Sequence, residues 1–123
     1  MLKQTHTVLP AADLQRARGY YHDKLGLDPV MEQPGNLMYD SGQGAAFELY
    51  ETSNAGTAKN TQMGWITDDL KNEMSVLRSR GVVFEDYDIP GMKTVDGVAT
   101  MDGLRAAWFR DSEGNFLCIT QRM

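Results

Sequence analysis

The sequence predicts an α+β protein built from two βαβββ units. Two observations lead to this fold class. One order of elements, a strand, a helix and three strands, can be read twice along the 123 residues. In addition, residues 40–51 and residues 110–121 share one layout, in which a Ser and a Gly precede alternating apolar residues. Two copies of one unit would place a functional site where the copies face each other.

The first unit is expected at residues 4–52. Its first strand, at residues 5–10, should end at Pro10, because proline is poorly tolerated inside a central strand. A helix should begin after the N-cap Asp13 and end at the C-cap Gly26. At helical spacing, its expected buried residues are Leu14, Ala17, Tyr21 and Leu25. Three further strands are expected at residues 27–32, 37–40 and 45–51.

The second unit is expected at residues 61–121, after a polar linker at residues 53–60 that lacks apolar periodicity. Its helix should be capped by Asp68 and Asp69 and should end at Gly81. The expected buried residues of this helix are Leu70, Met74 and Leu77. Strands are expected at residues 61–67, 82–87, 105–110 and 115–121, with a long irregular loop at residues 89–97.

Spacing between equivalent residues locates an insertion in the second unit. The helix-ending glycines Gly26 and Gly81 stand 55 residues apart, whereas Glu48 and Cys118 stand 70 residues apart. The second unit therefore contains 15 extra residues, which we place in the region around the loop at residues 89–97.

Composition excludes several classes of protein. With 41% hydrophobic and 24% charged residues, the 123-residue chain is expected to form a single globular domain. No apolar run approaches the ~20 residues of a membrane span, and no signal peptide is recognised, so a cytoplasmic location is expected. The net charge of −5 argues against a nucleic-acid partner, and the single cysteine, Cys118, excludes an internal disulfide.

Three short motifs resemble the vicinal oxygen chelate superfamily, which includes glyoxalase I, bleomycin resistance proteins, extradiol dioxygenases and fosfomycin resistance enzymes. The motifs are His6-Thr-Val-Leu-Pro with Asp13-Leu14 and Tyr20-Tyr21, then Leu25-Gly26-Leu27, and finally Trp108-Phe109-Arg110-Asp-Ser-Glu-Gly-Asn. The resemblance covers nearly the whole chain. It implies two βαβββ modules that form a curved mixed sheet, with a concave small-molecule cavity, outer helices and a homodimeric state.

The resemblance also implies four metal-binding positions, which fall on His6, Glu48, Gln62 and Cys118. Strand alternation independently turns Glu48 and Cys118 away from the side chains that pack under the helices. His6 and Glu48 are good ligands, whereas Gln62 is a weak oxygen ligand and Cys118 stands where the family usually has Glu. Zinc would be the metal that best matches this mixed set.

Two activities of the family fit this sequence poorly. Iron-dependent ring cleavage needs two His and one carboxylate, but the only other histidine, His22, is expected on the first helix. In a glyoxalase-type reaction the general base is normally a ligating carboxylate, and only Glu48 could fill that place.

Apolar side chains are expected to line the cavity. Of the neighbours Trp108 and Phe109, one must face the cavity, and we assign Trp108 to it because Phe109 matches Tyr39 of the first unit. The other expected ligand-binding residues are Met38, Tyr50 and Phe116. The loop at residues 90–97 is either a lid that brings Lys93 and Asp96 near the ligand or an ordinary surface loop.

Three functions therefore remain open. The first is binding of a small, partly apolar molecule without a cofactor, in the manner of a bleomycin resistance protein. The second is a metal-dependent lyase, isomerase or thiol transferase that uses His6 and Glu48, with Glu48 as the catalytic group. The third is a domain that serves chiefly for dimerisation. In plainer readings, His6 is a hydrogen-bonded strand-end residue, Glu48 faces solvent and Cys118 is an inert small hydrophobe.

Overall fold

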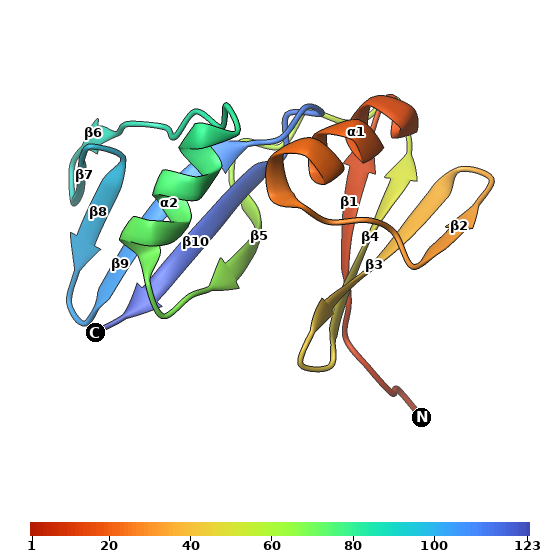
Figure 1. Cartoon of the computed structure of the whole chain (residues 1–123), viewed down its shortest axis with the longest axis horizontal. Coiled ribbons are helices and arrows are strands. Elements are labelled where there is room, and N and C mark those ends of the chain that lie inside the picture. Colours follow the sequence, from red (N-terminus) through yellow and green to blue (C-terminus); the bar gives the residue numbers. More distant parts are fainter. The chain divides into compact units, whose positions relative to one another are not determined.

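The computed structural model describes all 123 residues and confirms the α+β fold class (Figure 1). Two helices and two mixed sheets form two compact units. Unit 1 contains Met1–Ala58 together with Asp111–Asn115, and unit 2 contains Lys59–Arg110 together with Phe116–Met123.

Unit 1 is a four-stranded sheet covered on one face by a helix. Its elements are β1 (Thr7–Ala11), α1 (Leu14–Leu25), β2 (Met31–Gln33), β3 (Asn36–Gly42) and β4 (Ala45–Glu51). The strand order is β1-β4-β3-β2, with β1 parallel to β4 and the other pairs antiparallel. This is the βαβββ order that the sequence predicts.

The ends of α1 and its buried face follow the sequence pattern. The Asp13 side chain accepts a hydrogen bond from the Arg16 backbone at 3.0 Å, and Gly26 adopts a left-handed φ of 69°. Tyr21 is fully buried against the stacked rings of Tyr39 and Phe47, whose centroids lie 4.7 Å apart. Leu14 and Ala17 are buried as expected, and Leu25 is half-buried.

Unit 2 is a six-stranded sheet with one helix. Its elements are β5 (Thr61–Ile66), α2 (Leu70–Ser79), β6 (Asp88–Ile89), β7 (Met92–Val95), β8 (Val98–Met101), β9 (Leu104–Arg110) and β10 (Phe116–Arg122). The strand order is β5-β10-β9-β8-β7-β6, with β5 parallel to β10. Asp69 is the N-cap of α2, whose buried residues are Leu70, Met74 and Leu77, as the sequence predicts.

The prediction of an irregular loop at residues 89–97 is wrong, because this segment continues the sheet. β6, β7 and β8 form two successive antiparallel pairs. Asp96 and Gly97 both have positive φ, 52° and 80°, which is the backbone of a type I′ hairpin turn. The Asp-Gly dipeptide between Val95 and Val98 is the sequence signal for this hairpin.

Three strand predictions also differ from the structure. Residues 82–87 form no strand, and only Phe84 makes an isolated bridge, to Phe109. Pro10 lies inside β1, which tolerates it because β1 is an edge strand that pairs with β4 alone. The strand expected at residues 27–32 begins only at Met31, because the Leu27 backbone donates back to the carbonyl of Tyr21 at 2.9 Å and closes the helix end.

Candidate functional site

In unit 1, ligand-type side chains lie on the sheet face opposite α1. Val8, Glu48 and Met38 are register partners and form one row across β1, β4 and β3. Tyr50 lies on the same face of β4, two residues beyond Glu48, and its side chain is exposed. This face therefore combines apolar surface with the Glu48 carboxylate.

Glu48 is held by two polar neighbours. Asn36 Nδ2 donates a hydrogen bond to Glu48 Oε2. His6, one residue before β1, places its Nδ1 3.9 Å from Glu48 Oε1. The structure thus brings together the two ligand-type residues that the sequence assigns to unit 1, and adds Asn36.

In unit 2, the corresponding face is aromatic. Gly64, Cys118 and Trp108 are register partners and form one row across β5, β10 and β9 on the face opposite α2. Phe116 lies on the same face of β10, where the Arg110 guanidinium stands 5.6 Å from its ring centroid.

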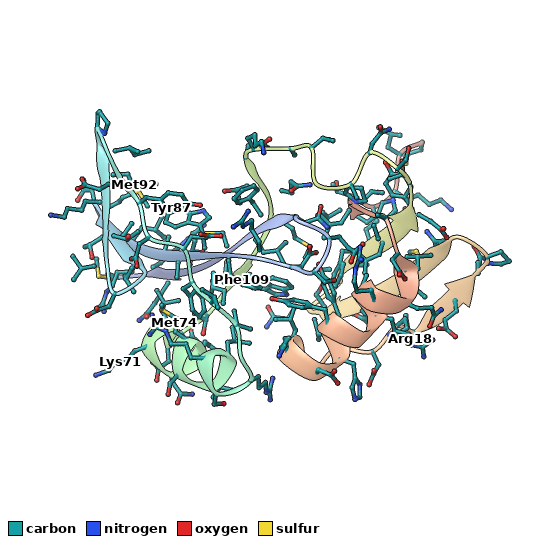
Figure 2. The ribbon with its side chains drawn as sticks, turned by 90° about the horizontal axis from the view of Figure 1, so that it is seen from above. Arg18, Lys71, Met74, Tyr87, Met92 and Phe109 are labelled. Atoms are coloured by element: carbon teal, nitrogen blue, oxygen red, sulfur yellow. The ribbon has the colours of Figure 1, made fainter.

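Trp108 is positioned by two contacts. Its Nε1 donates to Thr61 Oγ1 at 3.0 Å, and its ring meets the Tyr87 ring edge-to-face at a centroid distance of 5.7 Å. Phe109 is fully buried on the other face, against Phe84. Figure 2 shows Tyr87 and Met92 on one side of the unit 2 sheet and the helix residues Met74 and Lys71 on the other. Sequence reasoning missed Thr61 and Tyr87, because their contacts with Trp108 depend on the strand register and on the path of the chain after α2.

The two unit 2 candidates for metal binding are engaged in other interactions. Burial raises the pKa of the Cys118 thiol to about 11, although a hydrogen bond with the Ala107 backbone opposes this in part. The thiol therefore carries its proton near neutral pH. The Gln62 Oε1 atom already accepts a hydrogen bond from the Phe116 backbone at 2.9 Å, where the β5–β10 register shifts.

As a donor set, these four residues fit a metal centre poorly. Within either unit, no three side chains of His, Cys, Asp or Glu gather in a group that could hold a metal ion. Unit 1 offers one imidazole and one carboxylate, and unit 2 offers a protonated thiol and an amide. A protein metal site needs more anionic or imidazole donors than these four residues provide.

Two βαβββ-type units, each with ligand-type side chains on the sheet face opposite its helix, define a vicinal oxygen chelate fold. The chain belongs to the Glyoxalase/Bleomycin resistance protein/Dioxygenase superfamily, whose model matches residues 3–119. This confirms the resemblance seen in the sequence motifs. Among curated protein sequences, none matched this chain significantly.

Solved structures of the same fold include proteins that bind antibiotics. The antibiotic-binding protein TnmS3 from Streptomyces sp. CB03234 is 21% identical, with a TM-score of 0.68 and coverage of 100% of both chains. A bleomycin-binding protein complexed with bleomycin is 19% identical, with a TM-score of 0.72, over 99% of this chain and 100% of that chain.

A metal-containing relative shares the fold as well. The fosfomycin resistance protein FosX from Listeria monocytogenes, complexed with Mn(II) and sulfate, is 9% identical, with a TM-score of 0.72, over 100% of this chain and 92% of that chain. Identities this low show a shared fold and leave the function to the residues of the site. Neither helix of this chain is long and apolar enough to span a membrane.

Proposed function

We propose that this protein binds a small, partly apolar molecule through the sheet faces that lie opposite its helices, and that it does so without a complete metal centre. The observation that carries this proposal is the environment of Trp108. Its indole is fixed by Thr61 and Tyr87 on the face of the sheet opposite α2. A rigid aromatic surface of this kind suits stacking on a planar group of a ligand.

The remaining ligand-binding residues extend this proposal. We assign apolar contacts to Met38 and Tyr50 in unit 1 and to Phe116 beside Trp108 in unit 2. Glu48 would then recognise a polar or cationic group of the ligand, because its carboxylate stands among apolar side chains with only Asn36 and His6 as polar neighbours. Binding of this kind sequesters a molecule and needs no catalytic group.

Proteins of the same fold support a binding function. TnmS3 and the bleomycin-binding protein share the fold over nearly the whole chain and bind antibiotics. We therefore propose a drug-like natural product as the ligand class, and a homodimer located in the cytoplasm as the working form.

Tryptophan fluorescence tests the proposal. Bleomycin is the first probe, followed by a panel of planar aromatic cations. A ligand stacked on Trp108 should change the emission of the wild type and of Trp65→Phe, whose indole lies on the α2 face, but should not change that of Trp108→Phe. Loss of the response in Trp65→Phe alone would contradict the proposal.

Metal analysis of protein purified without chelator decides between binding and metal catalysis. We expect substoichiometric zinc, manganese, nickel and iron in the wild type. Near-stoichiometric metal that is lost in Glu48→Gln would overturn the proposal in favour of a lyase, isomerase or thiol transferase that uses His6 and Glu48. Asn36→Asp, which adds a carboxylate beside Glu48, serves as a gain-of-binding control for the assay.

A further inference from the structure

A groove lies beside α2, on the face of the unit 2 sheet opposite Trp108. Its wall is the α2 surface around Leu70 and Met74, and its floor is formed by Val95 of β7 and Val98 of β8. The cavity has a volume of about 500 Å³. This volume falls within the range of ordinary small-molecule sites, which hold ~300–1,000 Å³.

The groove exists because one helix cannot cover a sheet of this width. Six strands at a spacing of ~4.8 Å span roughly 24 Å, whereas a helix with its side chains is ~10 Å across. The order β1-β4-β3-β2 of unit 1 matches β5-β10-β9-β8 of unit 2, so β6 and β7 are the two strands that unit 1 lacks. They extend the floor beyond the helix and leave Val95 67% exposed.

Positive charge is concentrated along this groove. Its lining includes Lys71, Arg78, Lys93 and Arg105 and only one acidic residue, Asp96, so its net charge is +3. The rest of the chain then holds eight basic and sixteen acidic residues, a net charge of −8. A basic groove on so acidic a protein favours an anionic ligand over a cationic one.

Three of these cations are available to a ligand. Lys71, Lys93 and Arg105 make no ion pair in the structure, and the one contact of the Arg105 guanidinium is a weak hydrogen bond from Nε to Met123 Sδ at 3.2 Å. Arg78 has a structural role instead, since it donates to the Asp96 carbonyl at 2.8 Å and stacks on Phe84. Met74 points toward the sheet, and Lys71 extends sideways from α2 (Figure 2).

We infer that this groove binds a small organic anion, a carboxylate or phosphate monoester with an apolar body. The apolar body would lie on Val95 and Val98, and the anionic group would lie between Lys93, Arg105 and Lys71. This site is separate from the Trp108 face, and the inference stands independently of the proposed function.

The test is a titration of ¹⁵N-labelled protein with octanoate and octyl phosphate, monitored by backbone amide shifts. Neutral octanamide is the matched control for charge. We expect shifts at residues of β7, β8 and the start of α2 with either anion, weaker binding at high salt, and little response to octanamide.

Paired variants locate the anion. Because an exposed charge pair contributes at most about fivefold in affinity, Lys93→Gln with Arg105→Gln should weaken octanoate binding roughly tenfold. The control is Lys3→Gln with Lys59→Gln, which removes the same charge elsewhere and should leave the affinity within about twofold. Trp108→Phe should also leave it unchanged.

Three results would overturn the inference: equal binding of octanoate and octanamide, equal weakening by both pairs of substitutions, or shifts confined to residues around Trp108. Shifts with octanoate but not with octyl phosphate would restrict the ligand class to carboxylates and would still support it.

Discussion

At the scale of single residues, the segment Asp111–Asn115 shows how a turn becomes part of a core. Although it follows β9 in sequence, it belongs to unit 1. The buried Asp111 accepts hydrogen bonds from the Tyr21 hydroxyl at 2.7 Å and from two backbone amides of its own turn. Asn115 is fully buried and donates to the Pro10 carbonyl at 3.0 Å. These bonds satisfy polar groups that would otherwise destabilise the core.

Glu113 is the charged member of this segment. Its carboxylate accepts from the Asp13 backbone and from the Arg16 side chain at 2.9 to 3.1 Å. Burial alone would raise the pKa of Glu113, but the hydrogen bonds from Arg16, Asp13 and Ser112 outweigh it and lower the pKa below the ordinary value. Folding therefore stabilises the ionised form.

The Glu113→Gln substitution should reduce the free energy of unfolding at pH 7 by about 2 kcal/mol, because charge-assisted hydrogen bonds are lost. Since the folded pKa is lowered, this contribution is complete above the ordinary pKa of 4.5 and is lost as the pH falls through the folded pKa. Urea unfolding at pH 7, 4.5 and 3 measures both effects, and the difference between wild type and variant should shrink at pH 3.

Glu85→Gln is the matched control for this change. Glu85 pairs with Arg110 on the surface, with Nε and Oε1 2.6 Å apart, and such exposed pairs contribute less than about 1 kcal/mol. If both substitutions reduced the free energy of unfolding equally at pH 7, the buried hydrogen bonds of Glu113 would stabilise the protein no more than an exposed ion pair does.

Cys118 should react slowly with thiol reagents in the folded protein. With its pKa raised to about 11, only roughly one thiol in a thousand is ionised at pH 8, compared with about one in ten at the ordinary value of 9.0. Labelling with DTNB should therefore accelerate about tenfold per pH unit between pH 8 and 10.

Unfolding in urea is the control for this measurement, since it should restore ordinary reactivity to the only cysteine in the chain. Fast labelling of the folded protein at pH 7 would show a stabilised thiolate and would favour Cys118 as a metal ligand.

At the scale of elements, the strands β6–β8 are ones that the sequence pattern did not predict. Helix ends were predicted well, because Asp13, Gly26 and Asp69 act locally through their own backbone and side chains. These strands were missed because each has only two to four residues, too few for a clear alternation. What identifies them is pairing between strands, together with the Asp96-Gly97 turn.

Gly97 tests whether the β7–β8 turn packs against its surroundings. It has a φ of +80°, and an added Cβ would stand 3.1 Å from Phe84 Cβ and 3.3 Å from Met74 Cε. Left-handed strain costs about 1–2 kcal/mol and overpacking adds about 1–3 kcal/mol, so Gly97→Ala should destabilise the protein by about 3 kcal/mol.

Gly91 provides the matched control, because its φ is +86° and an added Cβ would meet no atom within 4 Å. Gly91→Ala should cost only the left-handed strain, about 1 kcal/mol. Thermal unfolding of both variants measures the difference, and equal losses of stability would mean that the β7–β8 turn is not packed as the structure has it.

At the scale of the whole molecule, the sequence predicts the sheet face on which a residue lies better than it predicts that residue's partners. Strand alternation placed Glu48 opposite Phe47 and Leu49, and the structure has these two residues buried under α1. It could not reveal that Asn36 binds Glu48, because that contact depends on the β3–β4 register. The roles assigned to His6, Gln62 and Cys118 as ligands, and to Met38, Tyr50 and Phe116 as ligand contacts, remain predictions.

Exposed apolar residues on the sheet faces opposite the helices support a homodimer. Val8 of β1 is 45% exposed and Ile66 of β5 is 72% exposed, and each belongs to an edge strand of its sheet. Unpaired edges with apolar side chains favour association with a second chain. We therefore expect light scattering coupled to gel filtration to give twice the chain mass at micromolar concentration.

The Ile66→Glu substitution should shift this equilibrium toward monomer, because burying an unpaired carboxylate in an apolar interface costs more than about 2 kcal/mol, or roughly thirtyfold in the dissociation constant. Val83→Glu is the control, since Val83 is 79% exposed and lies outside every strand. A wild type that stays monomeric at all concentrations would contradict the dimer. Equal dissociation of both variants would place the interface away from the β5 face. One dilution series of wild type and both variants distinguishes this result from a wild type that is always monomeric.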